Sequence, residues 1–188
     1  NKYADGTDID FGSPYYSGTD IDNNNNHYST STGYYYTPYN NNDATSSTTA
    51  DELIQKYGYL YNWKAATKGE SGDNVQGVCP DGWHVPTSTE WNSLKSYASQ
   101  HWGCSASGTN HDAKALSSTE LWESSSTACT PGNNRAQNNV SGFNAYPAGI
   151  YKPNQGYVLH TQFVNFWTST YEYYIAIGYQ TQVMDVNT

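Results

Sequence analysis

The sequence has few charged side chains, and basic ones are the scarcest. Its 188 residues include 8 Lys and Arg against 17 Asp and Glu, which gives a formal net charge of -9. A negative chain repels phosphate backbones and anionic lipids, and it lacks the electrostatic attraction on which nucleic-acid binding depends. Nucleic acid is therefore not an expected partner.

Long apolar runs are also missing. No stretch approaches the roughly 20 apolar residues that a transmembrane helix needs, so no direct membrane span is expected. The first residue, Asn1, is not an initiator methionine. We therefore expect a mature or trimmed product from which a signal or lipoprotein segment is missing.

Cysteine is rare, and its count is odd. Three cysteines in a secreted protein predict one disulfide and one further thiol. Cys104 and Cys129 bracket a polar loop that contains a short helical piece, HDAKALSS. A bridge between them would contribute about 3 to 4 kcal/mol of stability in the loop-entropy model. Cys79 is then left over, and one interpretation of it is a buried free thiol.

Tyrosine and small polar residues are abundant. The chain has 19 Tyr and 6 Trp but only 13% charged residues, so Ser, Thr, Asn and Tyr must provide most of its solubility. The motif GTDID occurs at residues 6–10 and again at 18–22. Closely spaced Asp side chains in a Gly-containing loop could supply oxygen ligands for calcium, although the spacing matches no EF-hand. The alternative is a pair of Asx-turns, in which each Asp accepts from its own backbone.

Two helices are predicted from caps and periodicity. The first, TTADELIQKYG, begins after Thr48 and ends at Gly58. The second begins at a capping box formed by Thr87 and Glu90, and its apolar stripe is Trp91, Leu94, Tyr97 and Ala98. Its stripe should pack on a sheet, with Trp91 as the largest buried side chain.

Strands are predicted on either side of the second helix. The segment YGYLYNW, residues 57–63, is rich in β-forming residues and should lead into a turn at Ala65 and Ala66. The segments GYVLHTQFVNFWTST and YYIAIGYQTQVMDV should supply two or three further strands. These elements predict an α+β fold with two helices on one side of a small antiparallel sheet and a high loop content.

A family resemblance rests on motifs spread along the chain. In order, these are YADGT, YYYTPYNNND, YGYLYNW, GVCPDGWHVPTSTEWNSL, AKALSST, NNVSGFNAYPAGIY and FWTSTYE. They resemble the Fibrobacter succinogenes major paralogous domain family. The resemblance implies an extracellular domain with a C-type-lectin-like fold, related to formylglycine-generating enzymes and to the variable proteins of diversity-generating retroelements.

The resemblance also implies how the domain is bounded. Residues 1–188 would form a single C-type-lectin-like domain that lacks its first and last strands. Such domains usually end in a strand whose cysteine could pair with the one before the Gly-Trp-His motif, here Cys79. In this view Cys79 has lost its partner to truncation, which is the alternative to a buried free thiol.

Catalysis is not expected. The related oxygenase uses two thiols to bind copper, whereas Cys104 and Cys129 lie in an Asn/Ser-rich loop typical of a disulfide. No GxSxG or HExxH motif is present, and the five histidines show no metal-ligand spacing. Neither a cofactor nor a metal is expected, apart from the calcium interpretation above.

The C-terminal aromatic segment is the predicted binding face. In the retroelement-diversified relatives this part of the chain binds ligand, and Tyr, Trp and Gln are side chains typical of antibody paratopes. The predicted ligand-binding residues are Trp167, Tyr171, Tyr173, Tyr174, Tyr179, Gln180 and Gln182. The alternative is a Tyr-rich strand in the core, since alternation sends about half of these side chains inward.

The sequence thus predicts an extracellular or cell-surface bacterial binding or adhesion module with a protein or glycan ligand, either anchored as a lipoprotein or carried at the tip of a larger assembly. Two alternatives remain open. One is a structural or assembly subunit whose missing edge strands are supplied by a neighbouring chain through β-augmentation. The other is a phage receptor-binding protein.

Overall fold

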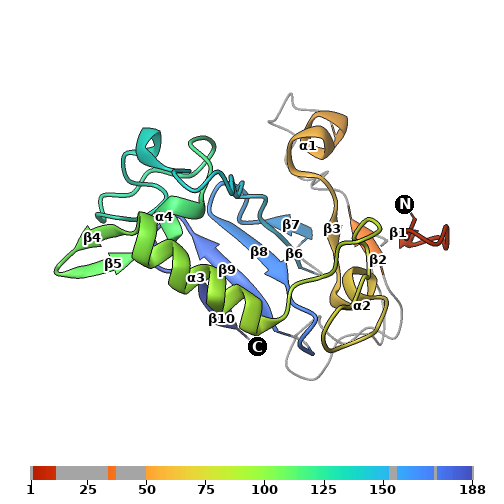
Figure 1. Cartoon of the computed structure of the whole chain (residues 1–188). Helices are drawn as coiled ribbons and strands as arrows, with labels where there is room; N and C mark the ends of the chain where they lie inside the picture. Colours follow the sequence, from red (N-terminus) through yellow and green to blue (C-terminus); the bar gives the residue numbers. More distant parts are fainter. Residues whose placement is uncertain (1, 12–33, 37–49, 153–155, 172, 188) are drawn as a thin grey trace, which may run out of the picture. The chain divides into compact units, whose positions relative to one another are not determined.

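The computed structural model describes residues 2–11, 34–36, 50–152, 156–171 and 173–187 (Figure 1). The chain forms two compact units, each assembled from separate segments. Unit 1 comprises Asn1–Thr87, Ile150–Val158 and Trp167–Glu172, and unit 2 comprises Ser88–Gly149, Leu159–Phe166 and Tyr173–Thr188. The chain passes between the units several times, and the expectation of one domain over 1–188 stays a prediction.

Unit 1 contains two small sheets. Strand β2 (Tyr34–Tyr36) pairs in parallel with β1 (Asp10–Phe11) and antiparallel with β3 (Leu60–Tyr61). Strands β6 (Ile150–Lys152) and β7 (Gly156–Val158) form an antiparallel pair. The buried Tyr36 ring stacks on Tyr151 with centroids 4.0 Å apart, so an aromatic contact links the two sheets.

The first predicted helix is confirmed as α1 (Ala50–Tyr57). The amide of Gly58 donates to the carbonyl oxygen of Ile54 over 2.8 Å, and Gly58 has a φ of 73°. This left-handed residue ends the helix, as the sequence predicts. Thr48, the expected start, lies outside the described residues.

The strand predicted at residues 57–63 is only partly correct. Strand β3 covers two residues of it, and the chain then enters helix α2 (Trp63–Thr67). The side chain of Asn62 accepts a hydrogen bond from the amide of Ala65 over 2.9 Å, which caps the helix. The predicted turn at Ala65 and Ala66 is therefore wrong, because these residues are buried within a capped helical turn.

Unit 2 is built on helix α3 (Ser88–Trp102), which begins one residue after Thr87, as the capping box predicts. Trp91 and Ala98 are buried, and Leu94 packs against the core. Tyr97 was expected in the buried stripe, but it is 49% exposed. Its ring instead stacks on His101, one helical turn further along the same helix.

A three-stranded sheet lies against α3 in unit 2 (Figure 1). Its strands are hydrogen-bonded in the order β10 (Asp185–Asn187), β9 (Tyr174–Gly178) and β8 (Phe163–Trp167), and β9 and β10 are antiparallel. The core between helix and sheet contains one large group of apolar side chains: Trp91, Ala98, Ala113, Leu116, Trp122, Ala145, Val164, Ile175, Ile177 and Met184. The prediction that the second helix packs on a sheet is confirmed.

The rest of unit 2 is a hairpin, two short helices and long loops. The hairpin pairs β4 (Cys104–Ala106) with β5 (Thr109–His111), and it is followed by α4 (Ala113–Leu116) and a 3-10 turn, η1 (Arg135–Gln137). The short helical piece predicted in HDAKALSS is confirmed as α4, so of the four α-helices in the described residues only α2 was not predicted. The fold is mixed, with few helices, small antiparallel sheets and many loop residues.

Candidate functional site

Two predicted ligand-binding residues, Trp167 and Tyr171, belong to unit 1. The indole Nε1 of Trp167 donates to the carbonyl oxygen of Tyr61 over 2.7 Å, so this half-buried side chain also fixes β3. Tyr171 is 58% exposed, and its ring meets the buried Trp63 ring edge-on at a centroid distance of 5.0 Å. Tyr171 therefore combines a fixed base with a large exposed surface.

The loop that carries Tyr171 is held by backbone hydrogen bonds. Trp63 Nε1 donates to the Thr168 carbonyl oxygen over 2.9 Å. The Ser169 amide donates to the Pro86 carbonyl oxygen over 2.9 Å, and its own carbonyl oxygen accepts from Gly72 over 3.0 Å. Three segments of unit 1 thus clamp residues 168–169, which limits the motion of the aromatic side chain that follows.

The other five predicted residues belong to unit 2. Tyr173 is 37% exposed and Gln180 is also exposed, whereas Tyr174 is half-buried. Tyr179 packs against the hydrophobic core, and Gln182 Nε2 donates to the Ala128 carbonyl oxygen over 2.9 Å. Tyr171, Tyr173 and Gln180 are thus the predicted residues with large exposed surfaces, and the role of all seven in binding stays a prediction.

Three other exposed aromatic residues were not among the predicted binding residues. Trp83 is 69% exposed, and Tyr97 and Trp102 on α3 are 49% and 37% exposed. The amide of Trp83 donates to the Pro80 carbonyl oxygen over 3.0 Å, and Gly82 has a φ of 82°, so PDGW is a tight turn with Trp83 at its end. The sequence Pro80-Asp81-Gly82 is typical of a surface turn, and it could have predicted that Trp83 is exposed.

The loop before that turn lies close to α2. The amide of Val78 donates to the Ala66 carbonyl oxygen over 3.0 Å, and the amide of Val85 donates to the Val75 carbonyl oxygen over 2.7 Å. Cys79 is a free, half-buried thiol, and burial raises its pKa. It is therefore less readily ionised than an exposed cysteine, and a thiolate function is disfavoured.

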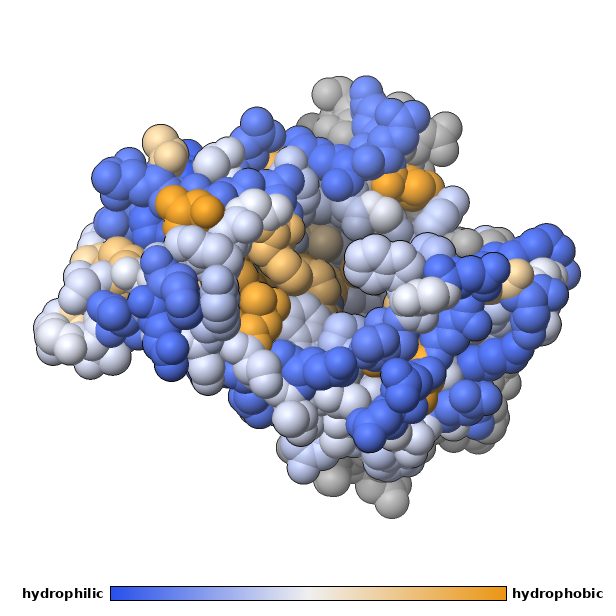
Figure 2. All heavy atoms as spheres, viewed as in Figure 1, coloured by the Kyte–Doolittle hydropathy of each residue, from blue (hydrophilic) through white to orange (hydrophobic). Residues whose placement is uncertain are grey.

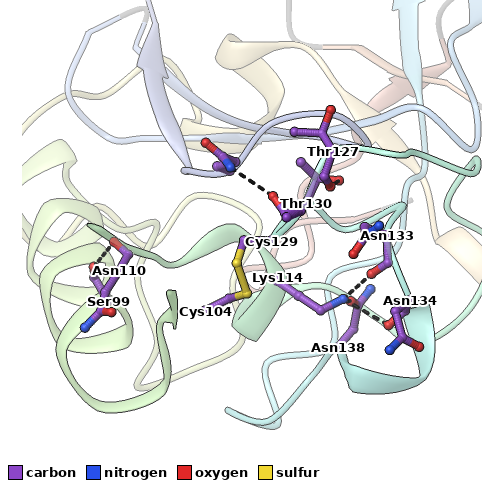
Figure 3. The surroundings of a disulfide bond; sticks show 12 residues. Ser99, Cys104, Asn110, Lys114, Thr127, Cys129, Thr130, Asn133, Asn134 and Asn138 are labelled. Atoms are coloured by element: carbon purple, nitrogen blue, oxygen red, sulfur yellow. Dashed lines mark hydrogen bonds between the residues drawn. A yellow bond between two sulfur atoms is a disulfide. The ribbon is translucent and has the colours of Figure 1, made fainter. Parts of the chain in front are cut away.

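Figure 3 shows the predicted disulfide between Cys104 and Cys129, which the structure confirms. The Cα atoms are 5.4 Å apart, and the bridge joins the β4–β5 hairpin to the loop that precedes η1. Ser99 Oγ donates to the Asn110 carbonyl oxygen over 2.8 Å, which holds the same hairpin against α3.

A buried lysine lies near the bridge (Figure 3). Lys114 is only 5% exposed, and its ammonium group contacts three oxygen acceptors. It donates to the Asn133 carbonyl oxygen, to the Asn134 carbonyl oxygen over 3.0 Å and to Asn138 Oδ1 over 2.7 Å. Burial lowers the Lys114 pKa, while the three acceptors stabilise its charged form. The arrangement ties α4 to the loop at residues 133–138.

The calcium interpretation receives no support from the described part of the GTDID pair. Asp8 forms an ion pair with Lys2, with 2.9 Å between Oδ1 and Nζ. Asp5, just before the motif, accepts from the Thr7 amide over 2.9 Å in an Asx-turn and pairs with Lys68, which lowers its pKa. The second copy, residues 18–22, lies outside the described residues.

Neither a metal cluster nor a membrane span is present in the parts of the chain that the structure describes. No three His, Cys, Asp or Glu side chains there come together as metal ligands would. None of the helices there has the length and apolar character that crossing a bilayer requires.

Comparison with known families matches residues 2–180 to the Fibrobacter succinogenes major domain. The chain belongs to this family. The match spans both compact units and includes every predicted binding residue except Gln182. In this member of the Fibrobacter succinogenes major domain family, the YGYLYNW and GVCPDGWHVP motifs form the α2 region and the adjoining loop of unit 1. Searches among curated proteins and among solved structures gave no match.

Proposed function

We propose that this family member is an extracellular or cell-surface bacterial binding module with a C-type-lectin-like fold. It recognises a protein or glycan ligand through exposed aromatic side chains of its C-terminal segment. The observation that carries the proposal is Tyr171, which is 58% exposed and rests edge-on against the buried Trp63. A large aromatic surface that is already fixed loses little entropy when a ligand covers it.

The location outside the cell is supported by the Cys104–Cys129 bridge, because disulfides persist in oxidising compartments. The surface composition agrees with this. Hydrophilic residues cover most of the face seen in Figure 2, and apolar residues occur there in small groups. With 13% charged residues in the chain, much of this polarity comes from hydroxyl and amide groups, which suit contacts to a glycan or a polar protein surface.

Binding is favoured over catalysis for a chemical reason. A copper site of the kind used by the related oxygenase needs two free thiols. Here Cys104 and Cys129 are joined to each other, and the pKa of the remaining thiol, Cys79, is raised by burial. This arrangement supports a structural use of cysteine.

The test is binding to an array of immobilised oligosaccharides and extracellular matrix proteins. We expect the wild-type chain to retain at least one of these, and Tyr171→Ser to weaken that binding about tenfold. Tyr59→Ser is the matched control, because Tyr59 is a 38% exposed tyrosine of unit 1 that also makes one edge-on contact, with Tyr35. Equal loss in both variants, or no binding by the wild type, would contradict the proposal.

A further inference from the structure

Three aromatic rings lie together at the C-terminal end of α3, in the middle of the chain and outside the C-terminal segment discussed above. Tyr97 and His101 stack with centroids 3.8 Å apart, and Trp102 meets Tyr97 edge-on at 5.2 Å. All three side chains are exposed, Tyr97 by 49% and Trp102 by 37%. We call Tyr97, His101 and Trp102 the α3 aromatic cluster. All of it belongs to unit 2.

The cluster is held in place by its surroundings. His101 Nδ1 lies 2.9 Å from the Tyr97 carbonyl oxygen, which can only accept, so Nδ1 donates to it and Nε2 takes no part in this bond. Trp102 lies two residues before Cys104 and its disulfide. A Cβ on Gly103 would lie 2.3 Å from the Ser99 carbonyl oxygen, so only glycine allows the hairpin to fold back this closely. The rings are thus fixed before any ligand arrives.

The chain around the cluster carries no formal charge. From Ser96 to His111 there is no Asp, Glu, Lys or Arg, although the whole chain has a net charge of -9. The exposed neighbours are hydroxyl and amide side chains, including Gln100, Ser105 and Asn110. Lys95 and Asp112 flank this stretch. Within it an ionic ligand meets no side chain of opposite formal charge, whereas a neutral, hydroxyl-rich ligand can exchange hydrogen bonds with the amides and hydroxyls.

We propose that the α3 aromatic cluster binds an uncharged oligosaccharide. The C–H groups of a sugar ring are apolar and slightly positive, so they pack on the negative face of an aromatic ring. Sugar hydroxyls then find acceptors and donors in His101 Nε2 and the neighbouring amides. The inference rests on the proposed binding function and adds to it a site on α3 with a stated class of ligand.

The experiment is an NMR titration of the 15N-labelled chain with cellohexaose, maltohexaose and mannohexaose, with oligogalacturonate as the charged comparison. We expect at least one uncharged hexasaccharide to shift the Trp102 indole signal and not that of Trp83. Trp102→Ala and Tyr97→Ser should each raise the dissociation constant about tenfold. Trp83→Ala is the matched control, because Trp83 is a more exposed tryptophan in unit 1. Its dissociation constant should equal that of the wild type.

Several results would overturn the inference. The Trp102 signal could fail to move with any uncharged hexasaccharide at millimolar concentration, or both cluster variants could bind like the wild type. Oligogalacturonate could bind equally well, or sedimentation could show self-association that Trp102→Ala abolishes. Near-UV circular dichroism shows whether Trp102→Ala and Tyr97→Ser are folded. If one of them is not, the dissociation constant of the other decides the test. Weakened array binding in Tyr171→Ser, together with a Trp102 signal that no uncharged hexasaccharide moves, would reject this site and leave the proposed function standing.

Discussion

Gly77 lies against the Ala66 carbonyl group, at the point where the GVCPDGWHVP loop passes α2. A Cβ at this position would be 1.9 Å from the Ala66 oxygen, and the φ of Gly77 is 53°. Gly82 is a matched control, because its φ is 82° and a Cβ there would meet nothing within 4 Å. Gly82→Ala should cost about 1 kcal/mol for the left-handed backbone alone. Gly77→Ala should cost about 1 to 3 kcal/mol more, because it adds the steric clash. Urea unfolding measures both, and equal losses would contradict this account.

Asp112 makes stability depend on pH. It is 1% exposed, and burial raises its pKa above the ordinary value of 3.8, although the Met184 amide donates to Oδ2 over 3.0 Å. A raised carboxyl pKa means that the folded chain holds the proton more tightly than the unfolded chain. This contribution to the free energy of unfolding is full below pH 3.8 and is lost as pH rises through the folded pKa.

Two variants at this position separate charge from hydrogen bonding. Asp112→Asn should remove the Asp112 pH dependence while keeping an oxygen acceptor for the Met184 amide, so its stability at pH 7 should equal or exceed that of the wild type. Asp112→Ala should remove the same pH dependence but lose about 1 to 3 kcal/mol, since the buried amide is left without its acceptor. Unfolding from pH 4 to pH 8 tests this, and an unchanged profile in both variants would refute the role of Asp112.

Single residues also show the limits of periodicity. Trp91 and Ala98 were predicted in the core from their spacing, and they are buried there. Tyr97 fits the same helical stripe, but it faces solvent beside His101. Spacing defines one side of a helix to within about a third of its circumference. Spacing does not show how far the sheet extends beneath the helix, and this extent determines whether Tyr97 is buried.

At the scale of elements, Lys114 is the main polar link between α4 and the loop at residues 133–138. Lys114→Met should leave the buried Asn138 Oδ1 and the half-buried Asn133 carbonyl oxygen without the lysine donor, and it should cost about 1 to 3 kcal/mol. Lys56→Met on α1 is the control, because Lys56 is exposed. Hydrogen exchange should quicken at residues 133–139 in the Lys114 variant only. Unchanged exchange there would mean that the loop is held by other contacts.

The disulfide stabilises the neighbouring pair of elements, the β4–β5 hairpin and the loop before η1. Its two cysteines are 25 residues apart, so the double variant Cys104→Ser, Cys129→Ser should lose about 3 kcal/mol. Cys79→Ser should change stability little, because Cys79 is a half-buried free thiol. Chemical denaturation under oxidising conditions compares the three proteins. Equal stability of the double variant and the wild type would contradict the structural role.

Caps made α1 and α3 predictable, whereas α2 was missed. Thr87 and Glu90 specify where α3 begins, and Gly58 specifies where α1 ends. The aromatic β-forming residues of YGYLYNW predicted a strand, whereas Asn62 in fact caps the short helix α2. The energy of α2 comes from burying Trp63, Ala65 and Ala66 against distant segments, and single-sequence propensity contains no term for such contacts.

For the whole molecule, motifs were more informative than periodicity. The segment order identified the family, and the family match over residues 2–180 confirms it. The division of the predicted binding residues between two compact units could not be predicted from the sequence. It arises because residues 150–158 and 167–172 pack with the N-terminal part of the chain in unit 1, while the residues on either side of them belong to unit 2. The C-type-lectin-like fold, the cell-surface location and the strand-completion and phage alternatives stay predictions.

The most direct test of the central claim is the affinity of the wild-type chain and of Tyr171→Ser for the best ligand found on the array. Calorimetry of both proteins, with Tyr59→Ser alongside, gives the three dissociation constants. The account predicts about tenfold weaker binding for Tyr171→Ser and an unchanged value for Tyr59→Ser. An unchanged value for Tyr171→Ser would contradict the claim that this chain binds its ligand through the exposed aromatic side chains of its C-terminal segment.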